Sequence, residues 1–252
     1  MRTLILVVLF LLGVHAHASP VLLTTAFEEG NYRDAASDAI AMGSADGLAF
    51  AARCNLAEAM SDPTFTPPEP LILEAERLAR ESLALDPRHV EGRLQLAIAL
   101  SLRARPLSTR AAMRSGFGDE AKALAEAVLV DDPNNYYAHG FMAVWHIEVV
   151  RRGGSVGSAI MGASVRRARN HYQAAIQANP SDVSTHWQYA RALTALNAKK
   201  YRKEIDAALG AAIGQKPPTA LDTVMQNRAK TLKSALNSEP RRTVQATAAD
   251  ML

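Results

Sequence analysis

Three Asx-Pro pairs divide this chain into segments of nearly equal length. They are Asp86-Pro87, Asp132-Pro133 and Asn179-Pro180, and their prolines are spaced by 46 and 47 residues. Each pair ends one apolar helical stretch, because a residue that precedes proline is disfavoured in the helical conformation. Helix breaks at a fixed period are typical of helical repeats, in which each helix pair packs against the next. The sequence therefore predicts an all-α fold, an α-solenoid of stacked helix pairs.

Hydrophobic periodicity predicts helices along the whole body of the chain and no strand. The expected helices span 21–29, 32–42, 46–60, 70–85, 89–104, 118–131, 135–152, 159–178, 182–197, 200–213 and 218–236. Proline and glycine mark most of the joints, and long joints are expected at 61–69, 105–117 and 153–160. Residues 238–252 show weak periodicity, so we expect a mobile C-terminal tail after a repeat domain that spans residues 19–237.

The N-terminus has the pattern of a secretory signal peptide. Arg2 precedes an apolar run from Leu4 to Val14, and Ala16-His17-Ala18 supplies small residues at the positions that a signal peptidase reads. We expect cleavage after residue 18, a mature chain that begins at Ser19, and export, with the periplasm as the destination. A retained membrane anchor is the alternative, but the run is shorter than the roughly 20 apolar residues that span a bilayer. Stable membrane insertion of the mature chain is not expected.

Alignment of the segments on their prolines shows which positions repeat. An alanine lies ten residues after each proline, and the residue before that alanine is larger and apolar or aromatic. The pairs are Leu96-Ala97, Met142-Ala143 and Tyr189-Ala190. Before the third proline, Ala168, Tyr172 and Ala175 share one helical stripe. Small residues beside large ones predict helices that approach one another closely.

At these residues the chain resembles the tetratricopeptide repeat family, over residues 26–237 and most strongly from Asp132 to Leu209. The resemblance implies a right-handed superhelix of stacked antiparallel helix pairs. The chain departs from the family in three ways. The small position of the first helix is alanine rather than glycine, Trp187 falls one residue late, and the early repeats exceed the usual length of roughly 34 residues by about a dozen. The extra residues fall in long loops within the repeats.

Two sets of residues are candidate binding positions. First helices line the concave surface of tetratricopeptide arrays, so the resemblance implies a groove lined by Tyr137, Trp145 and Trp187. Packing between repeats is the other interpretation of these aromatic residues. The long loops on one edge predict a basic rim that contacts an anionic or acidic partner. Its candidate residues are Arg110, Arg114, Arg151, Arg152 and Arg166. Arginines that only solvate helix ends are the alternative.

Catalytic and metal-binding motifs are weak. Gly153-Gly154-Ser155-Val156-Gly157 matches the G-x-S-x-G pattern of serine hydrolases, but that motif requires a strand before the serine, and none is predicted. His139 and His146 lie on one helix face, where histidines satisfied within a core or groove are commoner than metal ligands. Cys54 is the only cysteine, and a net charge of +3 is too small to indicate a nucleic-acid partner. We expect no enzymatic activity, no cofactor and no metal.

Two functions fit these observations. The first is an exported, non-enzymatic scaffold that binds a protein or peptide, as the tetratricopeptide resemblance implies. The second is an accessory solute-binding component of a periplasmic transport system. The stretch from Gly162 to Pro180, with Tyr189-Ala190 and the helix from Tyr201 to Leu209, is similar to the helical T component of tripartite periplasmic transporters. Neither reading predicts an oligomeric state.

Overall fold

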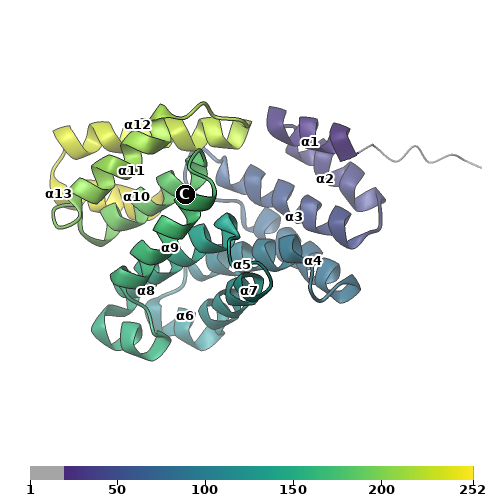
Figure 1. The fold of residues 1–252 in the computed structure, drawn as a ribbon, viewed down its shortest axis with the longest axis horizontal. Helices are drawn as coiled ribbons and strands as arrows, with labels where there is room; N and C mark the ends of the chain where they lie inside the picture. Colours follow the sequence, from purple (N-terminus) through teal and green to yellow (C-terminus); the bar gives the residue numbers. More distant parts are fainter. Residues whose placement is uncertain (1–19, 252) are drawn as a thin grey trace, which may run out of the picture.

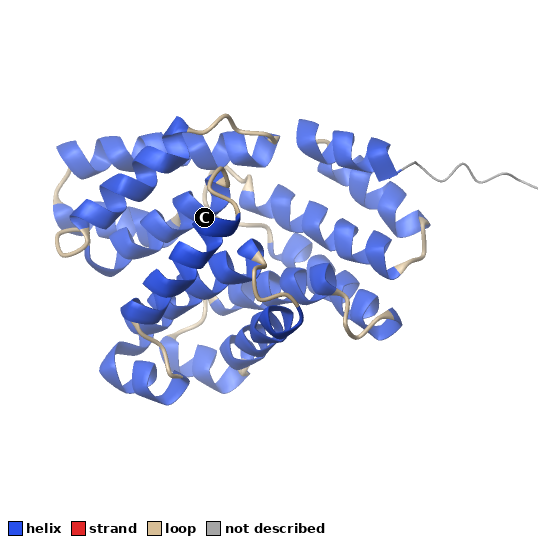
Figure 2. Ribbon diagram, viewed as in Figure 1, coloured by secondary structure: helices blue, strands red, loops and turns tan. Residues whose placement is uncertain are grey.

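The computed structural model describes residues 20–251, which form thirteen α-helices and no strand (Figures 1 and 2). The all-α prediction is therefore confirmed for this part of the chain. The helices are α1 (Pro20–Glu29), α2 (Tyr32–Ala41), α3 (Ala45–Met60), α4 (Glu69–Leu85), α5 (Val90–Ala104), α6 (Thr109–Ser115), α7 (Phe117–Asp131), α8 (Tyr136–Met161), α9 (Val165–Ala178), α10 (Val183–Asn197), α11 (Arg202–Gly214), α12 (Ala220–Ser238) and α13 (Arg241–Asp250).

The three Asx-Pro pairs build the same joint three times. Asp86, Asp132 and Asn179 each end a helix in an extended conformation, with φ near −140° (−137°, −137° and −142°). Each side chain then accepts a hydrogen bond from the backbone N–H two residues later, which forms an Asx turn. The residue three positions after each Asx caps the next helix with its own side chain. These caps are His89, Asn135 and Asp182.

A further contact repeats at the same joints. The sixth residue after each proline donates a side-chain N–H to the carbonyl oxygen of that proline. The donors are Arg93, His139 and His186, at 3.2, 3.0 and 3.0 Å. The donor is arginine in the first segment and histidine in the other two, and each side chain satisfies a carbonyl group that the helix break leaves unpaired. The hydrogen bond therefore repeats in all three segments, although the residue type repeats in only two.

The repeated alanine positions lie in the protein core, as their spacing predicts. Ala97, Ala143 and Ala190 are at most 1% exposed, and their larger neighbours Leu96, Met142 and Tyr189 are at most 2% exposed. Buried residues of α2 to α5, with one from α7, form an N-terminal core. Buried residues of α8 to α13 form a C-terminal core. The fold therefore has two main cores that meet along α5, α7 and α8.

Segments far apart in the chain connect these two cores. Helix α1 lies beside α12 (Figure 1). Arg228 of α12 donates to the carbonyl oxygens of Met60, the last residue of α3, and of Asp62, at 2.6 and 2.7 Å. Arg105, the residue after α5, donates to the carbonyl oxygens at the end of α13. We call these two sets of bonds the closing contacts, because they join the first helices to the last.

Three segments differ from the sequence-based expectation. The expected loop 105–117 contains α6, which Ser108 caps and which ends where Gly116 adopts a left-handed φ of 72°. The expected loop 153–160 is helical, because α8 breaks only at Gly154 (φ 59°) and then continues to Met161. The tail 238–252, expected to be mobile, contains α13, and the side chains of Val244 and Ala248 on α13 and of Met251 just after it are buried in the C-terminal core.

The predicted signal peptide, residues 1–18, and the predicted first mature residue Ser19 lie outside the described residues. Within residues 20–251, none of the helices combines the length and the apolar character needed to cross a bilayer.

Candidate functional site

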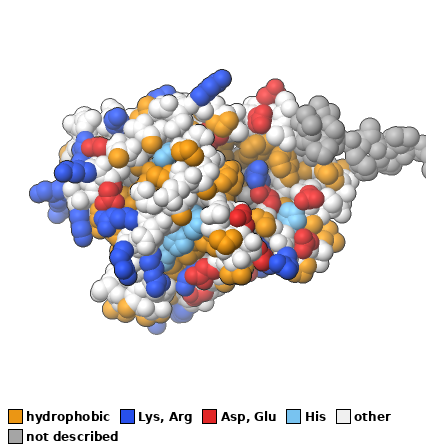
Figure 3. All heavy atoms as spheres, viewed as in Figure 1, with side chains coloured by type: hydrophobic (Ala, Val, Ile, Leu, Met, Phe, Trp, Pro, Cys, Tyr) orange, Lys and Arg blue, Asp and Glu red, His pale blue; other side chains and the backbone are white. Residues whose placement is uncertain are grey.

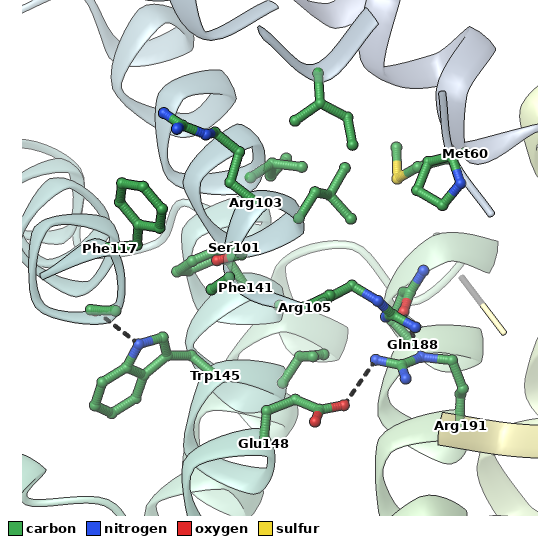
Figure 4. A pocket seen from close by; sticks show the side chains of 18 of the residues that line it. Met60, Ser101, Arg103, Arg105, Phe117, Phe141, Trp145, Glu148, Gln188 and Arg191 are labelled. Atoms are coloured by element: carbon green, nitrogen blue, oxygen red, sulfur yellow. Dashed lines mark hydrogen bonds and ion pairs between the residues drawn. The ribbon is translucent and has the colours of Figure 1, made fainter. Parts of the chain in front are cut away.

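A large cavity lies between the two cores and has a volume of about 1310 Å³. Residues of α3, α5, α7, α8, α10 and α12 contribute to its wall, so both cores line it. Figure 4 shows that Phe117 and Trp145 lie on one side of the view, with Arg103 near Phe117, and that Arg105, Gln188 and Arg191 gather on the other side. The size is that of a site for an organic molecule, since ligand sites are commonly concave and mostly apolar with a few polar groups.

The aromatic side of the cavity includes two of the predicted groove residues. Trp145 is 6% exposed, lines the cavity, and donates its indole N–H to the carbonyl oxygen of Gly118 at 3.0 Å. Tyr137 is 43% exposed and also lines the cavity, with the Arg53 guanidinium 5.8 Å from its ring centroid. Phe117 and Phe141 extend this apolar wall (Figure 4). The structure thus places Tyr137 and Trp145 around one space.

Trp187, the third predicted groove residue, lies elsewhere. Its side chain is fully buried in the C-terminal core, with Ile147 and Leu193. It does not line the large cavity. The reason is its position on α10, a central helix that packs against α8, α11, α12 and α13 and so has buried side chains around most of its circumference. In this structure Trp187 is a core residue and presents no surface to a ligand.

The polar side of the cavity contains three arginines and one glutamate, which we call the Arg-Glu cluster: Arg105, Arg151, Arg191 and Glu148. Glu148 accepts from Arg191 at 3.1 Å and from Arg151 at 2.8 Å. Arg191 also binds the side-chain oxygen of Gln188 at 2.9 Å and the carbonyl oxygen of Ala248 at 3.3 Å. Figure 4 shows Arg105, Gln188 and Arg191 side by side, with the Glu148 carboxylate directed at Arg191.

Arg105 and Arg152 differ from the other arginines that line the cavity, because their guanidinium groups bond to backbone carbonyl oxygens and neither forms an ion pair with a carboxylate among residues 20–251. Arg53 pairs with Glu91 and Arg103 with Glu76, whereas Arg151 and Arg191 share Glu148. Arg105 uses one nitrogen, Nη2, for the α13 carbonyl oxygens at 2.8 to 3.2 Å, and it forms no ion pair with a carboxylate among residues 20–251. The cluster therefore holds three guanidinium groups against one ion-paired carboxylate, Glu148, and Asp250 lies near Arg105 as a second negative charge.

The pKa values of the cluster reflect this imbalance. Burial lowers the pKa of Arg105 to about 9, and repulsion from Arg191 contributes. Burial also lowers the pKa of Arg191, although Glu148 opposes that shift. Burial acts to raise the pKa of Glu148, but attraction to Arg191 and Arg151 outweighs it, so this pKa lies below its usual value. By its count of ionisable groups, three arginines to one glutamate, the cluster has a positive formal charge.

The five arginines predicted as a basic rim do not form one exposed set. Arg110 and Arg114 are exposed on α6, and Arg166 is exposed at the start of α9. Arg151 is half-buried in the Arg-Glu cluster. Arg152 is half-buried too, and its guanidinium donates to the carbonyl oxygens of Ala104 and Leu107 at the end of α5. The difference arises because the expected loop at 153–160 is helical, so Arg151 and Arg152 lie within α8 and face the cavity rather than a loop edge.

Sequence reasoning missed Glu148 and Arg191 and named Arg105 only as a neighbour of a joint. One signal was available: Arg191 stands in the apolar run Tyr189-Ala190-Arg191-Ala192-Leu193. A charged residue in the middle of a helix that is otherwise buried needs a buried partner. The sequence does not say which residue that partner is, because Glu148 lies 43 positions away.

A histidine cluster lines a second, smaller cavity between α8 and α9, of about 310 Å³. It consists of His139, His146 and His171, and Figure 3 shows histidine side chains near the centre of this face of the molecule. His139 donates from Nε2 to the Pro133 carbonyl, so its Nδ1 accepts from Nδ1 of His171 at 2.9 Å. Among residues 20–251, buried Nδ1 of His146 has no hydrogen-bond partner. One of the two Nδ1 atoms in the contact between His139 and His171 must accept, so at least one of these two rings is neutral there.

We expect the histidine cluster to make the protein less stable in acid. Burial lowers the pKa of His146 and of His171 to about 4, and repulsion from neighbouring cationic groups, Arg167 among them, adds to this. The folded-state pKa lies below that of the unfolded chain, about 6.5, so protonation favours unfolding. Stability is therefore full above about pH 6.5 and falls as the pH drops towards 4, by about 1 kcal/mol per histidine, since the cavity admits solvent.

Urea denaturation at a series of pH values tests this expectation. In the variant His146→Leu the decline between about pH 6.5 and 4 should be shallower than in the unchanged protein. An identical decline in the two proteins would show that His146 does not titrate on unfolding.

The described residues offer little for hydrolysis or metal binding. Ser155 lies exposed just after the break at Gly154 and within a helix, not on the strand-to-helix turn of serine hydrolases. Between residues 20 and 251, His, Cys, Asp and Glu side chains do not come together in any group of three placed to hold a metal ion. Cys54 is buried, and burial raises the pKa of its thiol to about 12.

No protein-family model matches this chain, and no curated protein matches its sequence.

Proposed function

We propose that this protein is a non-enzymatic binding protein that holds a small organic molecule in its large cavity, as an accessory solute-binding component of a periplasmic transport system. The observation that carries the proposal is the cavity itself, about 1310 Å³ between two packed cores. The cavity is partly open to solvent, so a small molecule can enter it. Its wall is largely apolar and includes charged side chains, among them the Arg-Glu cluster, which is the usual composition of a ligand site.

The architecture that we propose is the one implied by the tetratricopeptide resemblance, a right-handed superhelix of antiparallel helix pairs. The support is the joint after each Asx-Pro pair, which is built from the same Asx turn, the same cap and the same contact to the proline carbonyl. Export to the periplasm is part of the proposal and rests on the signal-peptide pattern of residues 1–18.

Filling the cavity is expected to abolish ligand binding. Ser101 lies in the cavity wall near Phe141 (Figure 4). In the variant Ser101→Trp the indole takes up space inside the cavity. The amount of a small molecule that co-purifies with the protein should therefore fall by a factor of about ten or more. Native mass spectrometry of the purified protein measures the bound mass directly.

The matched control is Ser234→Trp, which adds the same side chain at an exposed position of α12 outside the cavity. It should leave the bound mass unchanged. If the unchanged protein carries no small molecule and binds none from a cell extract, the solute-binding proposal is wrong.

A scaffold that binds a protein or peptide is the second candidate. The observation in its favour is the end of α8, where Val156 and Ile160 are 70% and 67% exposed. Exposed apolar residues that adjoin one another are a common mark of protein interfaces. Cross-linking from position 156 in intact cells that captures a protein, together with an empty cavity in the purified protein, would favour the scaffold over the solute-binding protein.

A further inference from the structure

We propose that the ligand of the large cavity is an organic anion with an apolar body, and that its acidic group binds at the Arg-Glu cluster. This inference rests on the proposed function and adds the chemical class of the ligand. It is carried by the juxtaposition of three guanidinium groups with only two carboxylates, Glu148 and the nearby Asp250, at one side of a cavity whose wall is largely apolar.

The first step is the charge of the cluster. Arg191 is 2% exposed, and each of its nitrogens is already bound, to Gln188, Ala248 and Glu148. Arg105 is bound only through Nη2, and only to neutral carbonyl oxygens. Partly buried cations that outnumber the nearby carboxylates are costly, whereas an anion bound between them recovers the interaction. Arg105 and Arg151 are the residues with donors left for such an anion.

The second step is the shape of the acidic group. A guanidinium presents its N–H donors in a planar fork that matches the two oxygens of a carboxylate, and such charge-assisted pairs are stronger than neutral ones. Arg105 follows α5 and Arg151 lies on α8, so an acidic group held by both would bridge the two helices. The amide of Gln188 lies beside them (Figure 4).

The third step is the body of the ligand. Along α8, the residues Phe141, Val144 and Trp145 precede Glu148 and line the same cavity. Seven residues of helix separate Phe141 from Glu148, which is a rise of about 10 Å. Ile98 and Leu102 of α5 line the cavity as well. A ligand whose acid group binds at the cluster can therefore place an unbranched apolar chain along this apolar wall.

The test uses the full purified protein and three probes, decanoate, decanol and acetate, with calorimetry as the readout. Decanoate has both the acid group and the chain, decanol has only the chain, and acetate has only the acid group. We expect decanoate to bind at least about tenfold more tightly than either of the others. High salt should change this affinity little, because buried charges are weakly screened, whereas adsorption to exposed arginines would be lost.

Two variants locate the acid group. Arg151→Gln leaves Glu148 paired with Arg191. It should weaken the binding of decanoate by about tenfold or more and leave the binding of decanol unchanged. Arg105→Gln should have the same effect, and thermal unfolding is measured alongside because this residue also binds the end of α13. The matched control is Arg93→Gln, an arginine of α5 that is paired with Asp131 outside the cavity. It should leave decanoate binding unchanged.

Each result decides the question. Equal affinity for decanoate and decanol, or decanoate binding that neither Arg105→Gln nor Arg151→Gln weakens, overturns the anion inference and leaves a neutral ligand for the proposed cavity. Failure of all three probes, with a neutral molecule found in the purified protein, overturns the inference alone. Failure of all probes with an empty purified protein overturns the solute-binding proposal too.

Discussion

Replacing Trp187 with alanine is expected to lower the free energy of unfolding by about 4 kcal/mol, the largest effect of a single substitution that we predict. The indole is fully buried in the C-terminal core, on the helix that contacts α8, α11, α12 and α13. Its removal leaves a void that the surrounding helices, fixed on several sides, cannot close. Urea denaturation followed by circular dichroism gives the change in free energy.

Tyr137→Ala is the matched control for Trp187→Ala. Both residues were predicted to line a groove, but Tyr137 is 43% exposed and its truncation should cost no more than about 1 kcal/mol. If Trp187→Ala is as stable as Tyr137→Ala, the Trp187 side chain is not packed as the structure shows. The prediction that Trp187 lines a binding groove would then be open again.

Replacing Glu148 with glutamine is expected to destabilise the protein by about 3 kcal/mol. Removal of one partner from a buried ion pair typically costs somewhat more, and here the Glu148 side chain is 23% exposed towards the cavity. Glutamine keeps nearly the same shape, so the loss is that of the negative charge among Arg105, Arg151 and Arg191. Thermal and urea unfolding of the ligand-free protein measure it.

A second substitution separates charge from packing at this position. The double variant Glu148→Gln with Arg151→Gln removes one of the uncompensated cations and should recover part of the lost stability. Glu204→Gln, which breaks a surface pair with Arg169, serves as the control and should cost less than about 1 kcal/mol. If the double variant is no more stable than Glu148→Gln, repulsion among the arginines is not what destabilises the single variant.

Local signals predicted much of the fold. The three Asx-Pro pairs locate three helix ends because proline restricts the residue before it, whatever the tertiary structure. Helices α6 and α13 were missed because they are short, and short helices depend on tertiary contacts more than on their own propensity. In α13 and just after it those contacts are made by Val244, Ala248 and Met251, which the sequence does not distinguish from the apolar residues of a mobile tail.

The candidate site was less predictable than the fold. Tyr137 and Trp145 were named because they lie on an expected first helix of a repeat, and both line the cavity. Trp187 lies on the next expected first helix, but α8, α11, α12 and α13 pack around that helix and the side chain is fully buried. The Arg-Glu cluster combines Arg105, Glu148 and Arg191 from three helices, and their proximity arises only from how the whole chain folds. A single sequence carries no record of such distances.

The closing contacts change how this chain can fold. In an open array each repeat touches only its neighbours, so the ends can unfold independently and folding can begin anywhere. Here Arg228 is joined to carbonyl groups 166 and 168 positions earlier, and Arg105 to those at the end of α13. The entropy of closing such long loops must be overcome late in folding, after the last helices have been synthesised. Unfolding should then be one cooperative transition, in which fraying of α12 or α13 also opens the cavity.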